Sequence, residues 1–280
     1  MGGFRFDPAA RYRMPVMFGP TAGPRQGPNG ETFDSTDAPF TVMGARFLSD
    51  RAALEALLPQ GFELNGEPVV TVEHTILHDL QWLAGRSYSM LGVKLPIAFT
   101  GADETLTGAL LTVLWENRPE PILSGREELG FNKLFADLPE PQIVGTSRRC
   151  RASWDGHGFF EMALTGLRPA SPPKAAPSDG TLHYAYMPPM GHEGTHESRT
   201  RVMLSPNPPV TPSRIVSYEA GEAELTFARS SFEQLPTMFH IVNALADLPV
   251  LEMRGGFTLR GLGKSDLREQ RMVRQKPFAE

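Results

Sequence analysis

Alternating apolar and polar residues along much of the chain predict β-strands. A period of two divides residues 69–78 (VVTVEHTILH) between two faces, one with Glu73 among Val69, Thr71, Thr75 and Leu77, the other with His74 and His78 among Val70, Val72 and Ile76. Similar stretches cover residues 106–116, 142–154, 159–167, 215–229 and 250–260. Strands and helices do not alternate regularly, so the pattern favours a mostly antiparallel sheet or barrel over a doubly wound fold.

Only a few segments have helical features. Residues 50–58 follow Ser49, a favourable N-cap residue, and apolar residues between 238 and 245 recur at helical spacing. A third candidate helix covers residues 125–138. The pattern therefore predicts a mostly antiparallel sheet or barrel with a few short helices.

Proline and glycine interrupt these elements often, with 26 prolines and 27 glycines in 280 residues. Proline-rich stretches at 15–39, 168–180 and 204–213 predict loops or an extended arm, because proline removes a backbone donor and disfavours helix before it. None has the length or polarity of an interdomain linker. We expect one domain over residues 1–280, with an extended N-terminal arm at 1–39 and a charged tail at 264–280.

Charge and cysteine content exclude several classes of protein. The 27 basic and 32 acidic residues give a net charge of −5 without a basic cluster, which argues against a nucleic-acid partner. The single cysteine, Cys150, excludes an intramolecular disulfide, and its strand position predicts a buried structural thiol. The longest apolar stretch, near residues 109–115, is too short to span a membrane. We expect a cytoplasmic protein without a membrane partner.

The segment LSGREELGFNKLFADLP contains the candidate chemistry. Ser124 and Glu127 have the spacing of a capping box, and a helix from there would place Lys133 on one face with Arg126, Leu129 and Gly130. Gly130 would leave open space beside Lys133. Burial of such a lysine lowers its pKa, and a neutral lysine can form an imine with a ketone. From the pattern alone, a surface lysine on an amphipathic helix is the alternative.

The longer segment WENRPEPILSGREELGFNKLFADLP resembles the signature of the acetoacetate decarboxylase-like superfamily, and PVMFGP, ALEALLPQGFEL, EPVVTVEH and DLPVLEM extend the resemblance along the chain. This resemblance implies an α+β domain built around a conical antiparallel β-barrel. There a Schiff-base lysine attacks a small keto acid at the bottom of an apolar funnel. It also implies a homo-oligomer that needs neither cofactor nor metal.

Matched residue by residue, the resemblance implies roles for three side chains. Lys133 would form the imine, and Glu73 would be a strand carboxylate that moves protons. Arg126 would position the substrate carboxylate or support the helix. The expected substrate pocket comprises Phe40, Tyr88, Met90, Glu127, Leu129 and Leu134. Two roles are open for Glu127: it caps the helix, or it supports the site.

Three positions depart from the decarboxylase pattern. Leu134 replaces the second lysine of a family triplet, Met90 replaces a strand carboxylate, and Phe40 falls near an N-terminal arginine. Lone-lysine members of the superfamily include aldolase–dehydratases, which condense pyruvate with an aldehyde. The departures slightly favour such an enzyme over a decarboxylase of acetoacetate or a related β-keto acid. A non-catalytic binder of small carbonyl compounds stays open if Lys133 is paired with a carboxylate and remains charged.

Competing motifs have weaker support. His192–His196 match H-E-x-x-H, but the glycines and the missing apolar face predict an exposed loop instead of a zinc site. Residues 261–265 (GLGKS) lack the first glycine of a phosphate-binding loop. His74 and His78 are expected in a core or pore wall. Period two places Glu73 and His74 on opposite faces; the pattern does not choose which faces the site, and the resemblance favours Glu73.

Overall fold

The computed structural model describes residues 3–174, 176–189, 199–209, 211–263 and 267–276. Its helices are few and short: α1 (Arg51–Glu55), α2 (Pro119–Ser124), α3 (Phe239–Ala246), two 3-10 turns (Val16–Phe18 and Gln81–Leu83) and a π-helical turn, η3 (Gly125–Leu129). In the described ranges, no helix has the length and apolar character needed to cross a membrane.

Strands make up most of the structure. They are β1 (Pro39–Leu48), β2 (Phe62–Leu64), β3 (Val69–Leu80), β4 (Arg86–Thr100), β5 (Thr105–Glu116), β6 (Lys133–Phe135), β7 (Gln142–Val144), β8 (Ser147–Trp154), β9 (His157–Pro169), β10 (Gly180–Met187), β11 (Arg199–Pro206), β12 (Arg214–Phe227), β13 (Glu252–Leu262) and β14 (Arg271–Val273).

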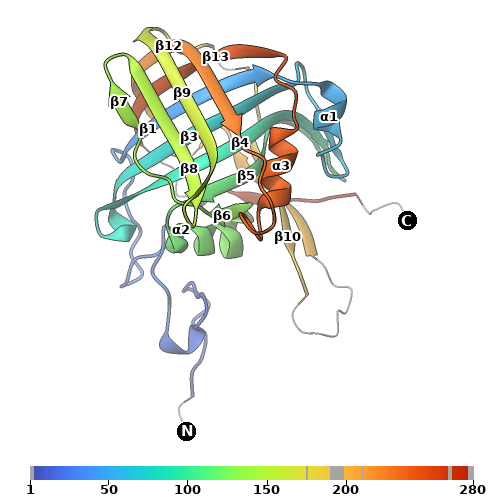
Figure 1. Cartoon of the computed structure of the whole chain (residues 1–280). Coiled ribbons are helices and arrows are strands. Elements are labelled where there is room, and N and C mark those ends of the chain that lie inside the picture. The colour runs from blue at the N-terminus through green and yellow to red at the C-terminus, as the bar shows by residue number, and fades with distance from the viewer. Residues whose placement is uncertain (1–2, 175, 190–198, 210, 264–266, 277–280) are drawn as a thin grey trace.

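These strands form one 14-stranded sheet in the order β14-β11-β10-β5-β4-β3-β1-β13-β12-β9-β8-β7, with β2 beside β4 and β6 beside β5. All pairings are antiparallel except β5 with β10 and β5 with β6. Figure 1 shows β8, β9 and β12 crossing the direction of β3, β4 and β5. The α+β class and the antiparallel sheet are confirmed, but over the described residues the sheet is open and does not close into a barrel.

The strand predictions were correct where the alternation was regular. Strands β3, β5, β9, β12 and β13 coincide with predicted stretches, and the stretch at 142–154 divides into β7 and β8. The 15-residue strand β4 was not among the strands predicted from alternation. It contains Gly92 and Pro96, which both weaken a strand pattern.

One helix prediction needs correction at both ends, and another is confirmed. The predicted helix at 50–58 is only α1, and its cap is Asp50 instead of Ser49, because the Asp50 carboxylate accepts a hydrogen bond from the Ala53 N–H at 2.9 Å. The Ser49 hydroxyl is buried and lacks a hydrogen-bond partner among the described residues. The helix predicted at 238–245 is confirmed as α3.

The predicted helix at 125–138 is wrong. A helix begins earlier, at Pro119 in the favourable first position, and widens into the turn η3, which ends at Gly130 with φ +70°. Ser124 has helical dihedrals and makes no capping hydrogen bond, so the capping box is also wrong. After Gly130 the chain is extended, because residues 133–135 pair with β5. This non-local pairing leaves no signal in helical periodicity.

A main hydrophobic core lies on one face of β3, β4 and β5. It contains Trp115, which is fully buried, together with Phe159 and Leu164 and the inner face of α3. Cys150 belongs to this core, as predicted, and burial raises its pKa to about 12. A smaller apolar cluster on the opposite face comprises Leu77, Leu80 and Tyr88. Strands β3 and β4 therefore bury side chains on both faces, and the lysine site lies on the face of the smaller cluster.

The corrected cap of α1 can be tested with two neighbouring substitutions. We expect Asp50→Ala to lower the free energy of unfolding by about 1 kcal/mol, because the Ala53 N–H loses its acceptor. Ser49→Ala should change it by less than about 0.5 kcal/mol, since the hydroxyl has no partner to lose. Urea unfolding of both variants measures the difference. If Ser49→Ala lowers the free energy of unfolding more than Asp50→Ala does, then Ser49 is the cap residue and the assignment of Asp50 is wrong.

Candidate active site

Lys133 is held at the first position of β6, parallel to β5. The register pairs it with Leu114, so its side chain lies on the same face of the sheet as Glu116. Its exposed fraction is 6%, and its Nζ lies 2.9 Å from Glu116 Oε1 and donates to the Pro121 carbonyl at 2.9 Å. The carboxylate partner of Lys133 thus comes from a neighbouring strand, 17 residues earlier in the chain.

Opposing effects act on the Lys133 ammonium. Burial, the larger effect, lowers its pKa, while the charge and hydrogen bond of Glu116 raise it, and the net direction is downward. Lys133 is therefore paired with a carboxylate and yet releases its proton more readily than an ordinary lysine. The same carboxylate is placed to receive that proton.

Gly125 makes room for the Lys133 side chain. A Cβ atom at position 125 would lie 2.5–2.6 Å from Cδ, Cε and Nζ of Lys133, far inside van der Waals contact. The expected role of Gly130 beside the lysine is wrong. Gly130 instead takes a left-handed conformation, and a Cβ there would lie 3.0 Å from Ala185 and Met203.

The N-terminal arm anchors the turn that carries Gly125. Arg13 and Arg25 both form ion pairs with Glu128 in η3, the second at 2.9 Å. All three side chains are mostly buried, so these pairs are less screened by solvent than ordinary surface pairs. The arm thus fixes η3 from outside, while Lys133 lies against it from inside.

A cavity of about 250 Å³ opens beside this lysine. Its wall combines apolar side chains, among them Met90, Leu111 and Leu114, with Glu73, Lys94 and His183. Lys133 itself is not part of the lining. Phe131 connects the two, because its ring lines the cavity and its centroid lies 5.1 Å from the lysine Nζ.

Glu73 lies in the cavity wall, where it forms an ion pair with Lys94. Lys94 is half-buried and was missed by the sequence analysis, although it lies two residues beyond Gly92 on the same face of β4 as Met90. The ion pair with Glu73 holds the Lys94 ammonium group at the cavity surface. A substrate carboxylate is the natural partner of such a cation.

His183 is the other residue that sequence reasoning missed, since no motif surrounds it. Its exposed fraction is 1%; Nε2 pairs with the Ser205 hydroxyl at 3.0 Å, and its ring stacks on Phe131 at 3.9 Å between centroids. Burial, followed by the charges of Lys133 and Lys94, lowers its pKa to about 3. The imidazole is therefore neutral at pH 7.

The other predicted site residues occupy different positions. Met90 lines the cavity, and Phe40 and Tyr88 belong to the small apolar cluster on the same face. Burial and the charge of Glu116 raise the pKa of Tyr88. Leu134 packs against the main core, on the far side of β6 from Lys133, and thus does not belong to the pocket.

The η3 residues predicted for the site face away from the cavity. Arg126 is exposed, and its guanidinium donates to the Lys133 carbonyl at 2.8 Å, so it holds the backbone of the lysine. Glu127 is exposed beside the N-terminal arm, and Leu129 is buried outside the cavity lining. His192–His196 and residues 264–265 lie outside the described residues.

The family model described as acetoacetate decarboxylase matches residues 13–269, and the chain belongs to that family. No protein with a curated description matches the sequence.

Solved structures share the fold at low sequence identity. A structure of acetoacetate decarboxylase is 15% identical with a TM-score of 0.65, covering 90% of this chain and 96% of that one. The acetoacetate decarboxylase of Legionella pneumophila is 16% identical with a TM-score of 0.60, over 85% and 90%. The enduracididine biosynthesis enzyme MppR complexed with pyruvate is 18% identical with a TM-score of 0.60, over 90% and 96%.

The space reserved by Gly125 can be tested by adding one methyl group. We expect Gly125→Ala to lower the free energy of unfolding by about 2–4 kcal/mol, because Lys133 must move and leave Glu116 buried without its partner. Gly158→Ala is the matched control, since its Cβ would meet no atom within 4 Å and its φ is not positive, and it should cost less than about 0.5 kcal/mol. Equal losses in urea unfolding would contradict this account of Gly125.

The buried His183 should make stability depend on pH. Its folded pKa is about 3 against 6.5 in the unfolded chain, so below pH 6.5 only the unfolded chain binds this proton, and stability falls toward acid. His183→Phe removes this effect. The stability of the wild type minus that of the variant should therefore drop by up to about 3 kcal/mol between pH 6.5 and 4. Urea unfolding at each pH measures this difference. If the free energy of unfolding changes with pH equally in the wild type and in His183→Phe, the prediction is wrong.

Proposed function

We propose that the protein is a Schiff-base-forming carbon–carbon lyase that acts on short keto acids, with Lys133 as the imine-forming residue. The observation that carries the proposal is the buried Lys133, whose pKa is lowered although Glu116 lies 2.9 Å away. A lysine of this kind supplies the neutral amine that attacks a ketone, and acetoacetate decarboxylase is the standard example of such activation.

The chemistry begins with a proton transfer from the Lys133 ammonium to the Glu116 carboxylate. The free amine adds to the keto carbon, so that a C–N bond forms, the C=O π bond opens, and the oxygen takes up the proton that the attacking nitrogen releases. Glu116 then returns its proton to the resulting hydroxyl, which leaves as water and gives an iminium ion. The positive nitrogen withdraws electrons from the neighbouring bonds of the substrate, and hydrolysis of the imine finally restores the lysine.

Lys94 is our candidate for binding the substrate carboxylate. Its ammonium lies in the cavity wall and is about one-third exposed, while Glu73 holds it in place. Glu73 would then act as the proton-transfer group once the substrate carboxylate takes over part of its contact with Lys94. This assignment keeps the proposed role of Glu73 and transfers the carboxylate-binding role from Arg126, which faces away.

Of the two lyase reactions, aldol condensation–dehydration with pyruvate is slightly favoured. Loss of a methyl proton from the pyruvate iminium gives an enamine, which attacks an aldehyde, and elimination of water then yields an unsaturated keto acid. Such an enzyme needs space for a second substrate. A neighbouring cavity of about 460 Å³ shares Glu73 and Lys94 with the first cavity and supplies that space. Met90 and Phe40, apolar where the decarboxylases carry charge, support the same choice.

Decarboxylation of acetoacetate or a related β-keto acid is the second candidate. It uses the same imine, into which the electrons of the C–CO₂ bond move as carbon dioxide leaves, and the resulting enamine takes up a proton. The small, largely apolar cavity beside Lys133 favours it, since a carboxylate is destabilised there relative to neutral carbon dioxide. The Lys133–Glu116 pair also keeps open a third candidate, a binder of small carbonyl compounds that performs no turnover.

Trapping with borohydride tests the imine directly. Incubation with pyruvate or acetoacetate and borohydride should add the reduced substrate to Lys133, as read by peptide mass spectrometry. Lys133→Met should abolish the adduct. Lys94→Met should leave the adduct on Lys133 but raise the pyruvate concentration needed for half-maximal trapping about tenfold, because one charged hydrogen bond to the carboxylate is lost. The absence of an adduct from both ketones in the folded wild type would reject the lyase proposal.

The reaction itself follows from product analysis of the same samples. Enone absorbance on addition of an aldehyde to pyruvate would establish condensation–dehydration. Carbon dioxide release from acetoacetate would establish decarboxylation. An adduct at Lys133 without either product would identify the binder.

A further inference from the structure

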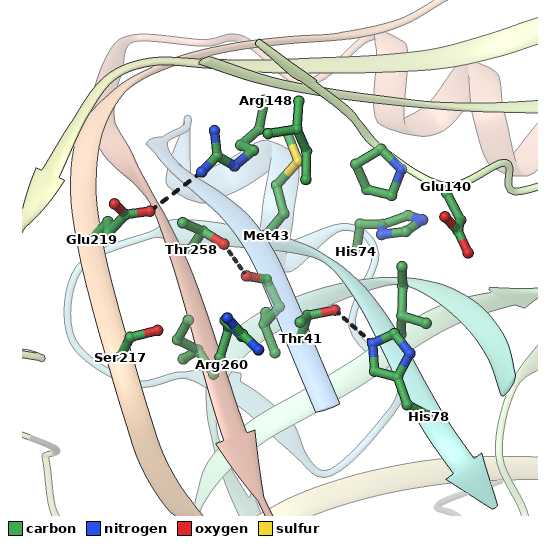
Figure 2. Close-up of a pocket in the computed structure, with 15 residues that line it drawn as sticks. Thr41, Met43, His74, His78, Glu140, Arg148, Ser217, Glu219, Thr258 and Arg260 are labelled. Carbon is green, nitrogen blue, oxygen red and sulfur yellow. Dashed lines mark hydrogen bonds and ion pairs between the residues drawn. The ribbon is translucent and has the colours of Figure 1, made fainter. Parts of the chain in front are cut away.

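A larger cavity lies on the opposite face of β3 (Figure 2). The strand divides its side chains between the two sites: Glu73 and Thr75 line the cavity beside the lysine, while His74, Ile76 and His78 line the second one. The second cavity has a volume of about 450 Å³, within the range typical of small-molecule sites. Residues from β1, β3, β8, β12 and β13 and from the segment before and within β7 surround it.

The wall is apolar toward the core and polar around the edge. Met43, Ile76 and Ile143 provide apolar surface, and Thr41, Ser217 and Thr258 provide hydroxyl groups. Two of these hydroxyls already have partners, because Thr41 pairs with His78 at 3.2 Å and Thr258 donates to the Val42 carbonyl at 2.9 Å. The site therefore offers contact area for an apolar body and few unsatisfied polar groups.

His74 is a buried polar group in the wall, and its Nε2 lacks a hydrogen-bond partner among the described residues. Its exposed fraction is 2%, and its Nε2 makes no hydrogen bond with any described residue. Burial lowers its pKa to about 4, so the ring is neutral at pH 7 and carries one N–H donor and one acceptor nitrogen. A ligand hydroxyl can pair with either tautomer, because it both donates and accepts. Such a bond would relieve the cost of a buried, unsatisfied polar atom.

The two arginines of the cavity differ in their partners. Arg148 is held by Glu219 at 3.6 Å and by the carbonyls of Gly145 and Ser147. Arg260 makes neither an ion pair nor a hydrogen bond with other described residues and is exposed at the edge. Figure 2 draws Arg260 and Glu219 on one side of the site, and His74 and Glu140 on the other. The available cation and the available neutral imidazole therefore lie at opposite ends.

The strand register gives the distance between those ends. Thr41 of β1 is paired with Arg260 of β13 and with Ile76 of β3, two residues from His74. Two strand spacings of about 4.8 Å and two residue rises of about 3.3 Å separate the Cα atoms of Arg260 and His74 by about 12 Å. Because both side chains extend toward the cavity, a ligand with polar ends about 8 Å apart fits between them.

We propose that this cavity is a second binding site, for a small hydroxylated monocarboxylate with an apolar body. The carboxylate would pair with the Arg260 guanidinium, the apolar body would cover Met43 and Ile76, and the hydroxyl would bond to His74 Nε2. Glu140, on the same side as His74, tolerates a hydroxyl but repels a second carboxylate, and this fixes the orientation. The site is independent of Lys133, since the sheet separates the two cavities.

The probe 3-(4-hydroxyphenyl)propionate has these groups at the required separation and no keto group, so it cannot form an imine. We expect saturable binding in isothermal titration calorimetry, and 3-phenylpropionate, which lacks the hydroxyl, should bind about fivefold more weakly. Arg260→Gln, an exposed substitution, should weaken the hydroxylated probe about five- to tenfold. His74→Phe should remove the preference between the two probes while retaining affinity for 3-phenylpropionate.

Lys94→Met is the matched control, because Lys94 is the cation of the other cavity and the substitution should leave probe affinity unchanged. Weaker binding in Lys94→Met with no change in Arg260→Gln would place the probe beside Lys133 and overturn the proposal. The proposal also fails if the wild type does not bind the hydroxylated probe at millimolar concentration, or binds both probes equally. Because the two probes are compared in the wild-type protein, this part of the test does not depend on whether any variant folds.

Discussion

The ion pair between Lys133 and Glu116 is the interaction on which the rest of the lysine site depends. Both groups are buried, and removing either would leave a charge without compensation in a low-dielectric environment. Several features of the chain serve this pair. Gly125 leaves the space that the lysine side chain occupies, Arg126 holds the lysine backbone, and the arm fixes η3 through Glu128. The same pair lets a lysine be both stably held and easily deprotonated, because burial lowers its pKa while a proton acceptor stays in contact.

Strand β3 lies between two cavities and serves both. Its side chains alternate, so neighbouring residues Glu73 and His74 contribute to different sites. Most sheets of this kind bury one face in a core and expose the other to solvent. Here the smaller apolar cluster and the buried pair of Lys133 and Glu116 lie on the second face. A sheet that is covered on both sides can hold ionisable groups out of water on both sides, and the lowered pKa values of His74 and His183 are the result.

Membership of the acetoacetate decarboxylase family accounts for the fold. Met90 lines the cavity, Phe40 packs against the small apolar cluster on the same face, and the cation of the cavity comes from Lys94 on β4. That cation is paired with Glu73 before any substrate arrives. The first step of the proposed reaction, formation of an imine, needs only a deprotonated lysine and a proton acceptor. The bond that breaks or forms afterwards depends on the groups around the cavity.

The sequence by itself determined the strand-rich α+β class, the two faces of β3, helix α3, the buried Cys150 and the identity of the candidate lysine. These follow from alternation, from short-range spacing and from a family motif, all of which are local in the chain. Only the tertiary structure decided that Lys133 lies on a strand, that Glu116 is its partner, that Lys94 holds Glu73 and that His183 stacks on Phe131. It also placed Leu134 and Arg126 away from the cavity. Each of these depends on pairing or packing between distant segments, and such contacts leave no periodic signal in the chain.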